Sequence, residues 1–209
     1  QMQSVSNSTQ NVQNLPPALQ NTPPPNTTPP AFDIMNYKYG NEDVYDIMTR
    51  YEGSKESAYP DAGGTSIGIG HQILPTDPVI WSDPSFKMNI QTQRSVFSRD
   101  FTQKYNEVMK MFKPETWANM EDDAKFIMTQ LNYNMNPDKI SQEFGKFYTA
   151  MANRDYAEAA RQLQWKDPDD PNSLPSDWFS NNQKRPQGTH RAIETIKMLN
   201  DLAAKKKNP

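Results

Sequence analysis

Several residue types that mark common kinds of functional site are scarce or absent in this chain. The 209 residues include no cysteine, which excludes disulfide bonds and thiolate metal ligands. The chain has only two histidines, His71 and His190, so we expect no histidine-rich metal site and no cofactor. The formal net charge of -3 gives no overall positive field, so nucleic acid is not expected as a partner. No apolar run is long enough for a membrane span.

Apolar residues are also scarce. They make up 34% of the chain, and the mean hydropathy is -0.93. Both values are low for a fully folded chain, so we expect that part of it is not packed into a core. The first residues lack the apolar stretch of a secretory signal, and the start at Gln1 suggests a piece processed or excised from a longer protein.

Residues 1–32 differ in composition from the rest. They contain no charged side chain and hold seven prolines, among Asn, Gln, Ser and Thr. Proline removes backbone donors and favours an extended backbone, and the segment has few apolar groups to bury. We interpret it as a linker or arm, either a tail without fixed structure or a segment that lies along a partner. The folded domain is then expected over residues 33–209.

The domain sequence alternates helical and strand-like patterns. Asn41 is expected to cap a first helix that stops at Gly53. The glycine-rich stretch 58–73 predicts short strands, as a hairpin or a three-stranded sheet. Apolar residues at helical spacing predict five later helices: one from Asn89, one over 124–131, one from Pro137 to Met151, one over 156–163 and a last one capped by Thr189. The pattern predicts an α+β fold, with a cleft between a small sheet and a mostly helical lobe.

A loop rich in proline and aspartate, residues 166–177, interrupts the later helices. Trp165 and Trp178 flank it, and aromatic faces can stack on sugar rings. Trp165 has helical spacing from its neighbour Leu163, so we expect it in the core.

The segment 52–71, EGSKESAYPDAGGTSIGIGH, holds the candidate chemistry. Glycosidic bonds are commonly cleaved by two carboxyl groups, one protonated to donate to the leaving oxygen and one ionised to activate water or stabilise the sugar cation. Glu52 lies at the C-terminal end of the predicted helix, where the helix dipole opposes a carboxylate. Asp61 follows in a turn, and Ser66 supplies a hydroxyl that could orient a water. On these residues alone, ordinary cap and turn roles for both acids remain equally open.

The string E-G-x(5)-Y-x-D-x(4)-S-I-G-I-G-H closely resembles the active-site segment of the T4-type phage lysozymes, glycoside hydrolase family 24. The resemblance continues more loosely over residues 41–202 and has no counterpart for the arm. It implies a lysozyme-like fold in which Glu52 is the general acid. It also implies that Asp61 holds or deprotonates the attacking water and that Ser66 helps to position this water.

The same resemblance implies roles for residues outside the string. Asn134 falls where the family has a polar residue on the cleft floor, which implies a substrate contact. His71 resembles a histidine that pairs with a helix aspartate, and Asp100 matches that partner. This pair is expected to be structural, and no metal ligand is implied.

Three departures from the family pattern bear on the site. Ser66 replaces the usual threonine, and in some relatives this change accompanies transglycosylation. The turn 62–64 is about one residue shorter than in the best-known member. An arginine expected near the start of the last helix is missing, so either Arg185 or Arg191 is left to contact Glu52.

The resemblance implies a muramidase that cleaves the glycan strand of bacterial peptidoglycan in the periplasm, with lytic transglycosylase as the enzymatic alternative. A virion-associated lysozyme, whose residues 1–32 bind phage tail or virion proteins, stands beside a free endolysin made in the host cell. The alternative class is a lysozyme-like structural or glycan-binding component of a phage particle with little or no activity. The intact Glu52 and Asp61 favour the enzyme.

Overall fold

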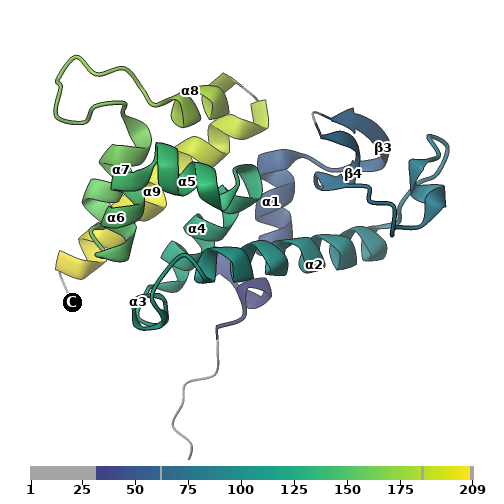
Figure 1. Cartoon of the computed structure of the whole chain (residues 1–209), viewed down its shortest axis with the longest axis horizontal. Coiled ribbons are helices and arrows are strands. Elements are labelled where there is room, and N and C mark those ends of the chain that lie inside the picture. Colours follow the sequence, from purple (N-terminus) through teal and green to yellow (C-terminus); the bar gives the residue numbers. More distant parts are fainter. Residues whose placement is uncertain (1–31, 62, 185, 208–209) are drawn as a thin grey trace, which may run out of the picture. The chain divides into compact units, whose positions relative to one another are not determined.

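The computed structural model describes residues 32–61, 63–184 and 186–207 (Figure 1). The chain divides into two units, Gln1–Phe32 and Asp33–Pro209, and the second is described below. The predicted arm, apart from Phe32, lies outside the described residues, and so does its expected contact with virion proteins.

The second unit consists of helices and two small antiparallel sheets, in agreement with the predicted α+β class. The helices are α1 (Val44–Glu52), α2 (Ile90–Met109), α3 (Pro114–Ala118), α4 (Asp122–Asn134), α5 (Pro137–Glu143), α6 (Gly145–Ala152), α7 (Tyr156–Gln164), α8 (Asp177–Lys184) and α9 (Pro186–Lys207), with 3-10 turns η2 (Ile34–Asn36) and η3 (Val79–Ser82). The strands are β1 (Lys38–Tyr39), β2 (Glu42–Asp43), β3 (Lys55–Asp61), β4 (Gly64–Gly68) and β5 (His71–Gln72).

The start of α1 differs from the prediction. Asp43, not Asn41, is the N-cap, and its side chain accepts a hydrogen bond of 2.9 Å from the N–H of Asp46. Asn41 instead lies in the turn of the β1–β2 hairpin, after Gly40 with its φ of 61°. A short carboxylate cap and a glycine that tolerates positive φ therefore fix where the hairpin ends and the helix begins.

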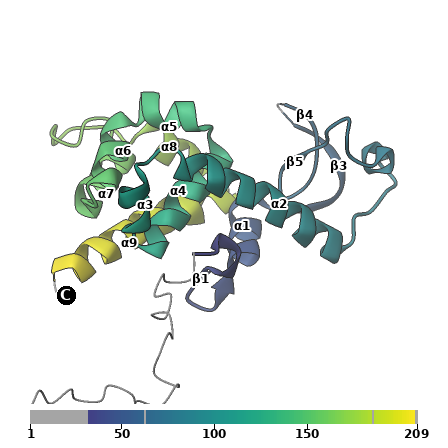
Figure 2. The same ribbon diagram turned by 60° about the horizontal axis from the view of Figure 1, so that its bottom comes forward.

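Strands β3, β4 and β5 form a three-stranded antiparallel sheet, which settles the choice that the sequence left open. The register pairs Tyr59 with Ser66 and Asp61 with Gly64. Ile67 pairs with His71 across β4 and β5 and is fully buried, packed with Trp81 and Met88. In Figures 1 and 2 this sheet lies by the N-terminal end of α2. Helices α5–α8 lie toward the opposite, C-terminal end of α2.

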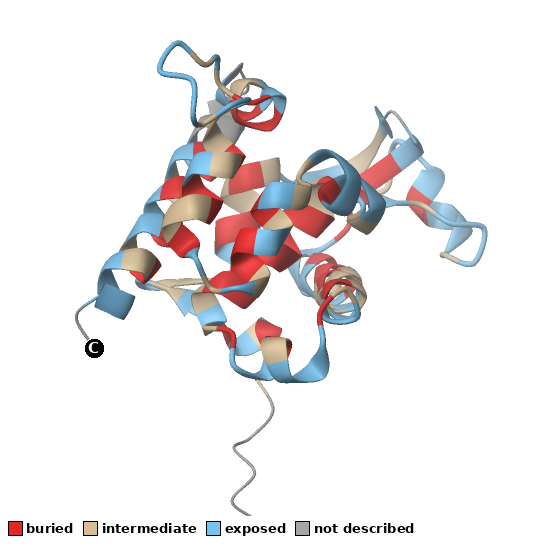
Figure 3. Ribbon diagram, turned by 60° about the vertical axis from the view of Figure 1, so that its left-hand side comes forward, coloured by how far each residue is buried: buried red, intermediate tan, exposed pale blue. Residues whose placement is uncertain are grey.

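Helix α4 is the central element of the helical lobe. Its residues are buried without a break from Ala124 to Asn132, as expected of a helix surrounded by others. Aromatic residues of α2 pack against it, since the ring centroids of Phe101 and Phe126 of α4 lie 6.3 Å apart. Figure 3 shows buried residues gathered on the inward sides of the helices.

Two helix predictions are wrong in detail, and two helices were missed. The single helix expected from Pro137 to Met151 is two helices, because Phe144 leaves helical geometry with φ -119° and ψ 35°. The last helix begins at Pro186, not after a cap at Thr189, since proline fits the first helical position. Helices α3 and α8 were not predicted; α3 spans only five residues, too few to show a period.

None of the helices in the described ranges combines the length and the apolar character that crossing a bilayer requires.

Candidate active site

Glu52 is the last residue of α1, and the backbone at Gly53 fixes its position. Gly53 has φ 77° and ψ 173°, a region that is essentially restricted to glycine, and its N–H donates to the carbonyl of Thr49 at 2.8 Å. The chain turns there out of the helix and into β3. The Glu52 carboxylate is therefore held at the junction of the helix and the sheet, with 18% of its side chain exposed.

Arg191 of α9 is the ion-pair partner of Glu52. Its Nη2 lies 2.6 Å from Glu52 Oε1, and its guanidinium carbon lies 5.2 Å from the centre of the Tyr51 ring. Arg191 is only 1% exposed, and a buried cation requires a counter-charge. Of the two arginines that the sequence offered for this contact, Arg191 makes it. The side chain of Arg185 lies outside the described residues.

A second ion pair ties the same two helices together. Glu194, one turn beyond Arg191 on α9, lies 2.7 Å from Arg50 Nη1 and accepts a hydrogen bond of 2.8 Å from the Tyr51 hydroxyl. Arg50 also pairs with Glu42 at 2.7 Å. These contacts lock α9 onto α1 and support the placement of Arg191 beside Glu52.

The structure brings Asp61 and Ser66 together across the hairpin. Ser66 Oγ donates a hydrogen bond of 3.2 Å to Asp61 Oδ2. Ser66 is 2% exposed on β4, whereas Asp61, at the end of β3, is exposed. A buried hydroxyl thus orients a carboxylate that faces solvent, and a carboxylate in this setting can accept a proton from water.

The charge of Glu52 contributes to the raised pKa values of two tyrosines, Tyr59 of β3 and Tyr133 of α4, and sequence reasoning gave neither a role. Burial, followed by the negative charges of Asp61 and Glu52, raises the pKa of Tyr59. Burial first, with smaller contributions that include Glu52, also raises the pKa of Tyr133, whose hydroxyl donates to the carbonyl of Ile69. Both candidate acids therefore lie within electrostatic reach of one phenol. Tyr59 was visible in the motif, but its role depends on the sheet register.

His71 contacts two carboxylates. Its Nδ1 lies 2.6 Å from Asp100 on α2, the contact that the resemblance implied, and its Nε2 lies 2.9 Å from Asp77, which sequence reasoning missed. Burial alone would lower the pKa of His71, but hydrogen bonds and charges from both carboxylates outweigh it and raise the pKa. Asp77 also accepts a hydrogen bond from the N–H of Leu74, which orders the loop after β5.

Asn134 is the last residue of α4 and lies directly after Tyr133. It lines a hollow of about 220 Å³ together with the buried Trp178 of α8. The prediction that Trp165 belongs to the core is wrong, because it is half-buried. It caps the C-terminal end of α7, where the chain leaves the helix and pairs with Pro175.

No group of three or more His, Cys, Asp and Glu side chains in the described part of the chain is arranged to hold a metal ion. No protein-family model and no curated protein matches this chain.

Proposed function

We propose that the chain is a muramidase of lysozyme-like fold that hydrolyses the glycan strand of bacterial peptidoglycan, with Glu52 and Asp61 as its two acids. The observation that carries the proposal is the presence of two carboxyl groups in unlike settings, whose charges both help to raise the pKa of Tyr59. Glu52 is mostly buried beside Arg191, whereas Asp61 is exposed and bonded to Ser66. Glycosidases commonly divide the acid and base roles between two such groups.

Each carboxyl group has one task in this reaction. Glu52 in its protonated form donates that proton to the glycosidic oxygen as the bond to the muramic acid C1 breaks, and the carboxylate that remains returns to the ion pair with Arg191. A water attacks C1 and loses its proton to Asp61, whose orientation Ser66 maintains. Arg191 and Gly53 position Glu52 for the transfer. The likeness of the string Glu52–His71 to the phage lysozymes supports the same assignment. We therefore also propose that the reaction takes place in the periplasmic cell wall, by a virion-borne or a free enzyme.

The test is lysis of outer-membrane-permeabilised bacteria by the full chain, followed as loss of turbidity. Glu52→Gln should lower the rate by about a hundredfold or more, because general acid catalysis of this kind contributes about 10² to 10⁴. The matched control is Glu56→Gln, an exposed acid on β3 whose side chain is 65% exposed and lies 3.9 Å from Lys87. This control should lyse at the native rate.

Unchanged lysis by folded Glu52→Gln would refute the assignment. A native chain that sediments with purified peptidoglycan but releases no fragments from it would support the alternative, a glycan-binding component of a phage particle.

A further inference from the structure

Helix α9 carries a second acid close to the arginine that pairs with Glu52. Glu194 follows Arg191 by three residues, and side chains at this spacing are neighbours on a helix surface, where opposite charges attract. Yet Arg191 pairs with Glu52 of α1 at 2.6 Å, and no ion pair within the described residues joins it to Glu194. Glu194 is therefore a competitor for Arg191 that is directed elsewhere.

Two residues of α1 occupy the Glu194 carboxylate. Arg50 Nη1 lies 2.7 Å from its Oε1, and the hydroxyl of Tyr51 donates a hydrogen bond of 2.8 Å to its Oε2. Each carboxylate oxygen thus has a partner from α1. Burial, followed by the charge of Glu194 and its hydrogen bond, raises the pKa of Tyr51. The Tyr51 hydroxyl therefore stays protonated and remains a donor to Glu194.

The guanidinium group of Arg191 is buried but not held by hydrogen bonds. Arg191 is 1% exposed, and its Nε and Nη2 make no hydrogen bond within the described residues. Its contact with Glu52 therefore rests on charge. The ring of Tyr51, which is 3% exposed, has the guanidinium carbons of both Arg50 and Arg191 at 5.2 Å from its centre. Burial of this kind leaves little water to screen Arg191 from a nearby carboxylate.

The competition matters most in the form of the enzyme that reacts. Glu52 must be protonated to donate to the glycosidic oxygen, and protonation removes the charge that attracts Arg191. A buried cation without a counter-charge is costly, so Arg191 is then drawn to any free carboxylate within reach. Glu194 is not free while Arg50 and Tyr51 occupy it.

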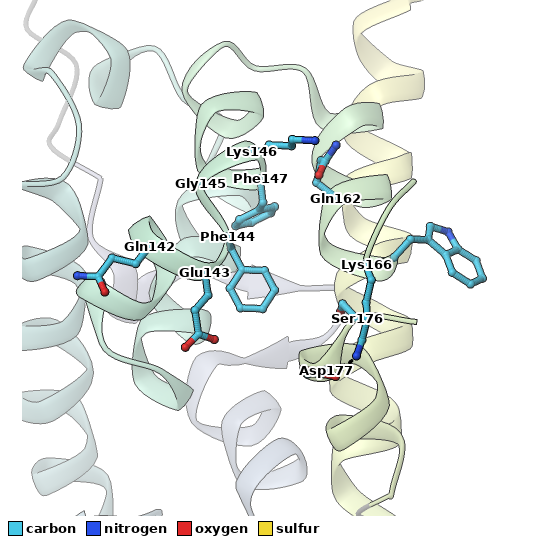
Figure 4. A pocket seen from close by; sticks show the side chains of 11 residues that line it. Gln142, Glu143, Phe144, Gly145, Lys146, Phe147, Gln162, Lys166, Ser176 and Asp177 are labelled. Atoms are coloured by element: carbon cyan, nitrogen blue, oxygen red, sulfur yellow. Dashed lines mark ion pairs between the residues drawn. The ribbon is translucent and has the colours of Figure 1, made fainter. Parts of the chain in front are cut away.

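We propose that Arg50 and Tyr51 are positioning residues of the catalytic site, which hold Glu194 against α1 and thereby keep Arg191 beside Glu52. This inference rests on the proposed function, and it makes Glu194 an acid that disturbs the site when it is released. None of these five side chains lines the hollow of about 690 Å³ between α5, α6, α7 and the start of α8 (Figure 4). The arrangement therefore belongs to the packed contact of α1 with α9.

The test is the kcat of the full chain on purified peptidoglycan. Arg50→Met frees Glu194 and should lower kcat by about tenfold, because a displaced Arg191 leaves the acid misaligned. Adding Glu194→Gln to Arg50→Met removes the competitor and should restore kcat to within about twofold of the native value, since the two residues are coupled. The double variant has lost more native contacts than the single variant, so a purely structural role of the ion pair does not produce this recovery.

A milder variant and a matched control accompany this pair. Tyr51→Phe keeps the ring and removes only the hydrogen bond to Glu194, so it should lower kcat by about threefold, and Glu194→Gln should again restore it. The control is Arg94→Met on α2, because Arg94 also pairs with two acids and lies 4.2 Å from the centre of a tyrosine ring. It should keep the native kcat, and urea unfolding checks that each variant is folded.

Nitrogen NMR of the isotope-labelled chain provides a readout that does not need cleavage. The Nε–H signal of Arg191, identified by its loss in Arg191→Met, should move in Arg50→Met and return toward its native position in the double variant. A signal that stays in place in Arg50→Met, or an equally low kcat in the single and double variants, would overturn the inference and leave the muramidase standing. The expected signal changes in a native chain that releases no fragments would instead refute the proposed function, while showing that Glu194 competes for Arg191.

Discussion

Glu52 and Arg191 form an unequal pair, in which the cation is almost fully buried and the acid keeps contact with solvent. The unequal burial suits an acid that must meet a substrate, since the protein holds the partner and leaves the carboxyl accessible. The sequence motif could indicate Glu52, because the whole string lies in one segment. It could not choose between Arg185 and Arg191, because that choice depends on where α9 begins.

Replacing Arg191 with methionine tests this pairing. Arg191→Met removes the counter-charge and leaves Glu52 partly buried and unoriented, so the free energy of unfolding should fall by about 1–3 kcal/mol. The lysis rate should fall at least about tenfold, because a misplaced acid loses its alignment with the glycosidic oxygen. Urea unfolding and turbidity measure the two effects.

The control for this variant is Arg94→Met on α2, an exposed arginine that lies 3.1 Å from both Asp43 and Asp46. It should keep native lysis. A folded Arg191→Met protein with native lysis would show that Glu52 does not need this partner.

At the scale of elements, His71 joins β5 to α2 through Asp100 and to the following loop through Asp77. The Asp100 contact followed from the family resemblance. Asp77 did not, because its approach depends on the path of a loop that carries no periodic pattern. The same limit explains the helix errors: apolar spacing continues through Phe144, and only the backbone turn there separates α5 from α6.

The pH dependence of stability follows from the raised pKa of His71. A group whose pKa is raised on folding stabilises the protein fully below its unfolded pKa, about 6.5 for histidine, and loses this contribution as the pH rises through the folded pKa. Burial alone would raise the pKa of Asp77, but hydrogen bonds from the Leu74 N–H and from His71 outweigh it and lower the pKa. The stabilisation that ionised Asp77 contributes is therefore lost only when the pH falls into the acid range.

We therefore expect His71→Gln to cost about 1–3 kcal/mol near pH 6, and less as the pH is raised. Urea unfolding of the native chain and the variant over a series of pH values measures the difference. A difference that stays constant from mildly acidic to alkaline pH would mean that the protonated histidine is not what holds these elements together.

At the scale of the whole molecule, the site draws on α1, the three-stranded sheet and α9, which come from both ends of the second unit. The sequence predicted the α+β class and most of the long helices, since their apolar periods are strong. It could not predict that α1 and α9 contact each other, because ion pairs such as Arg50–Glu194 join segments that share no local pattern.

Deleting residues 1–32 tests the division of the chain. The described core and the candidate site lie within residues 33–209, so the shortened chain should fold and lyse permeabilised cells at the native rate. If the arm is an anchor, incorporation into a phage particle should be lost, as measured by assaying purified particles for the protein. Loss of lysis would mean that the arm is part of the catalytic fold.

The most direct test of the central claim is mass spectrometry of peptidoglycan digested in water enriched in heavy oxygen. Hydrolysis by Glu52 and Asp61 predicts fragments that end in a reducing muramic acid with one heavy oxygen from water at C1. Glu56→Gln should give the same fragments and Glu52→Gln should give none. Fragments that end in an anhydro sugar without solvent oxygen would contradict the account, because no water would then have attacked opposite Glu52.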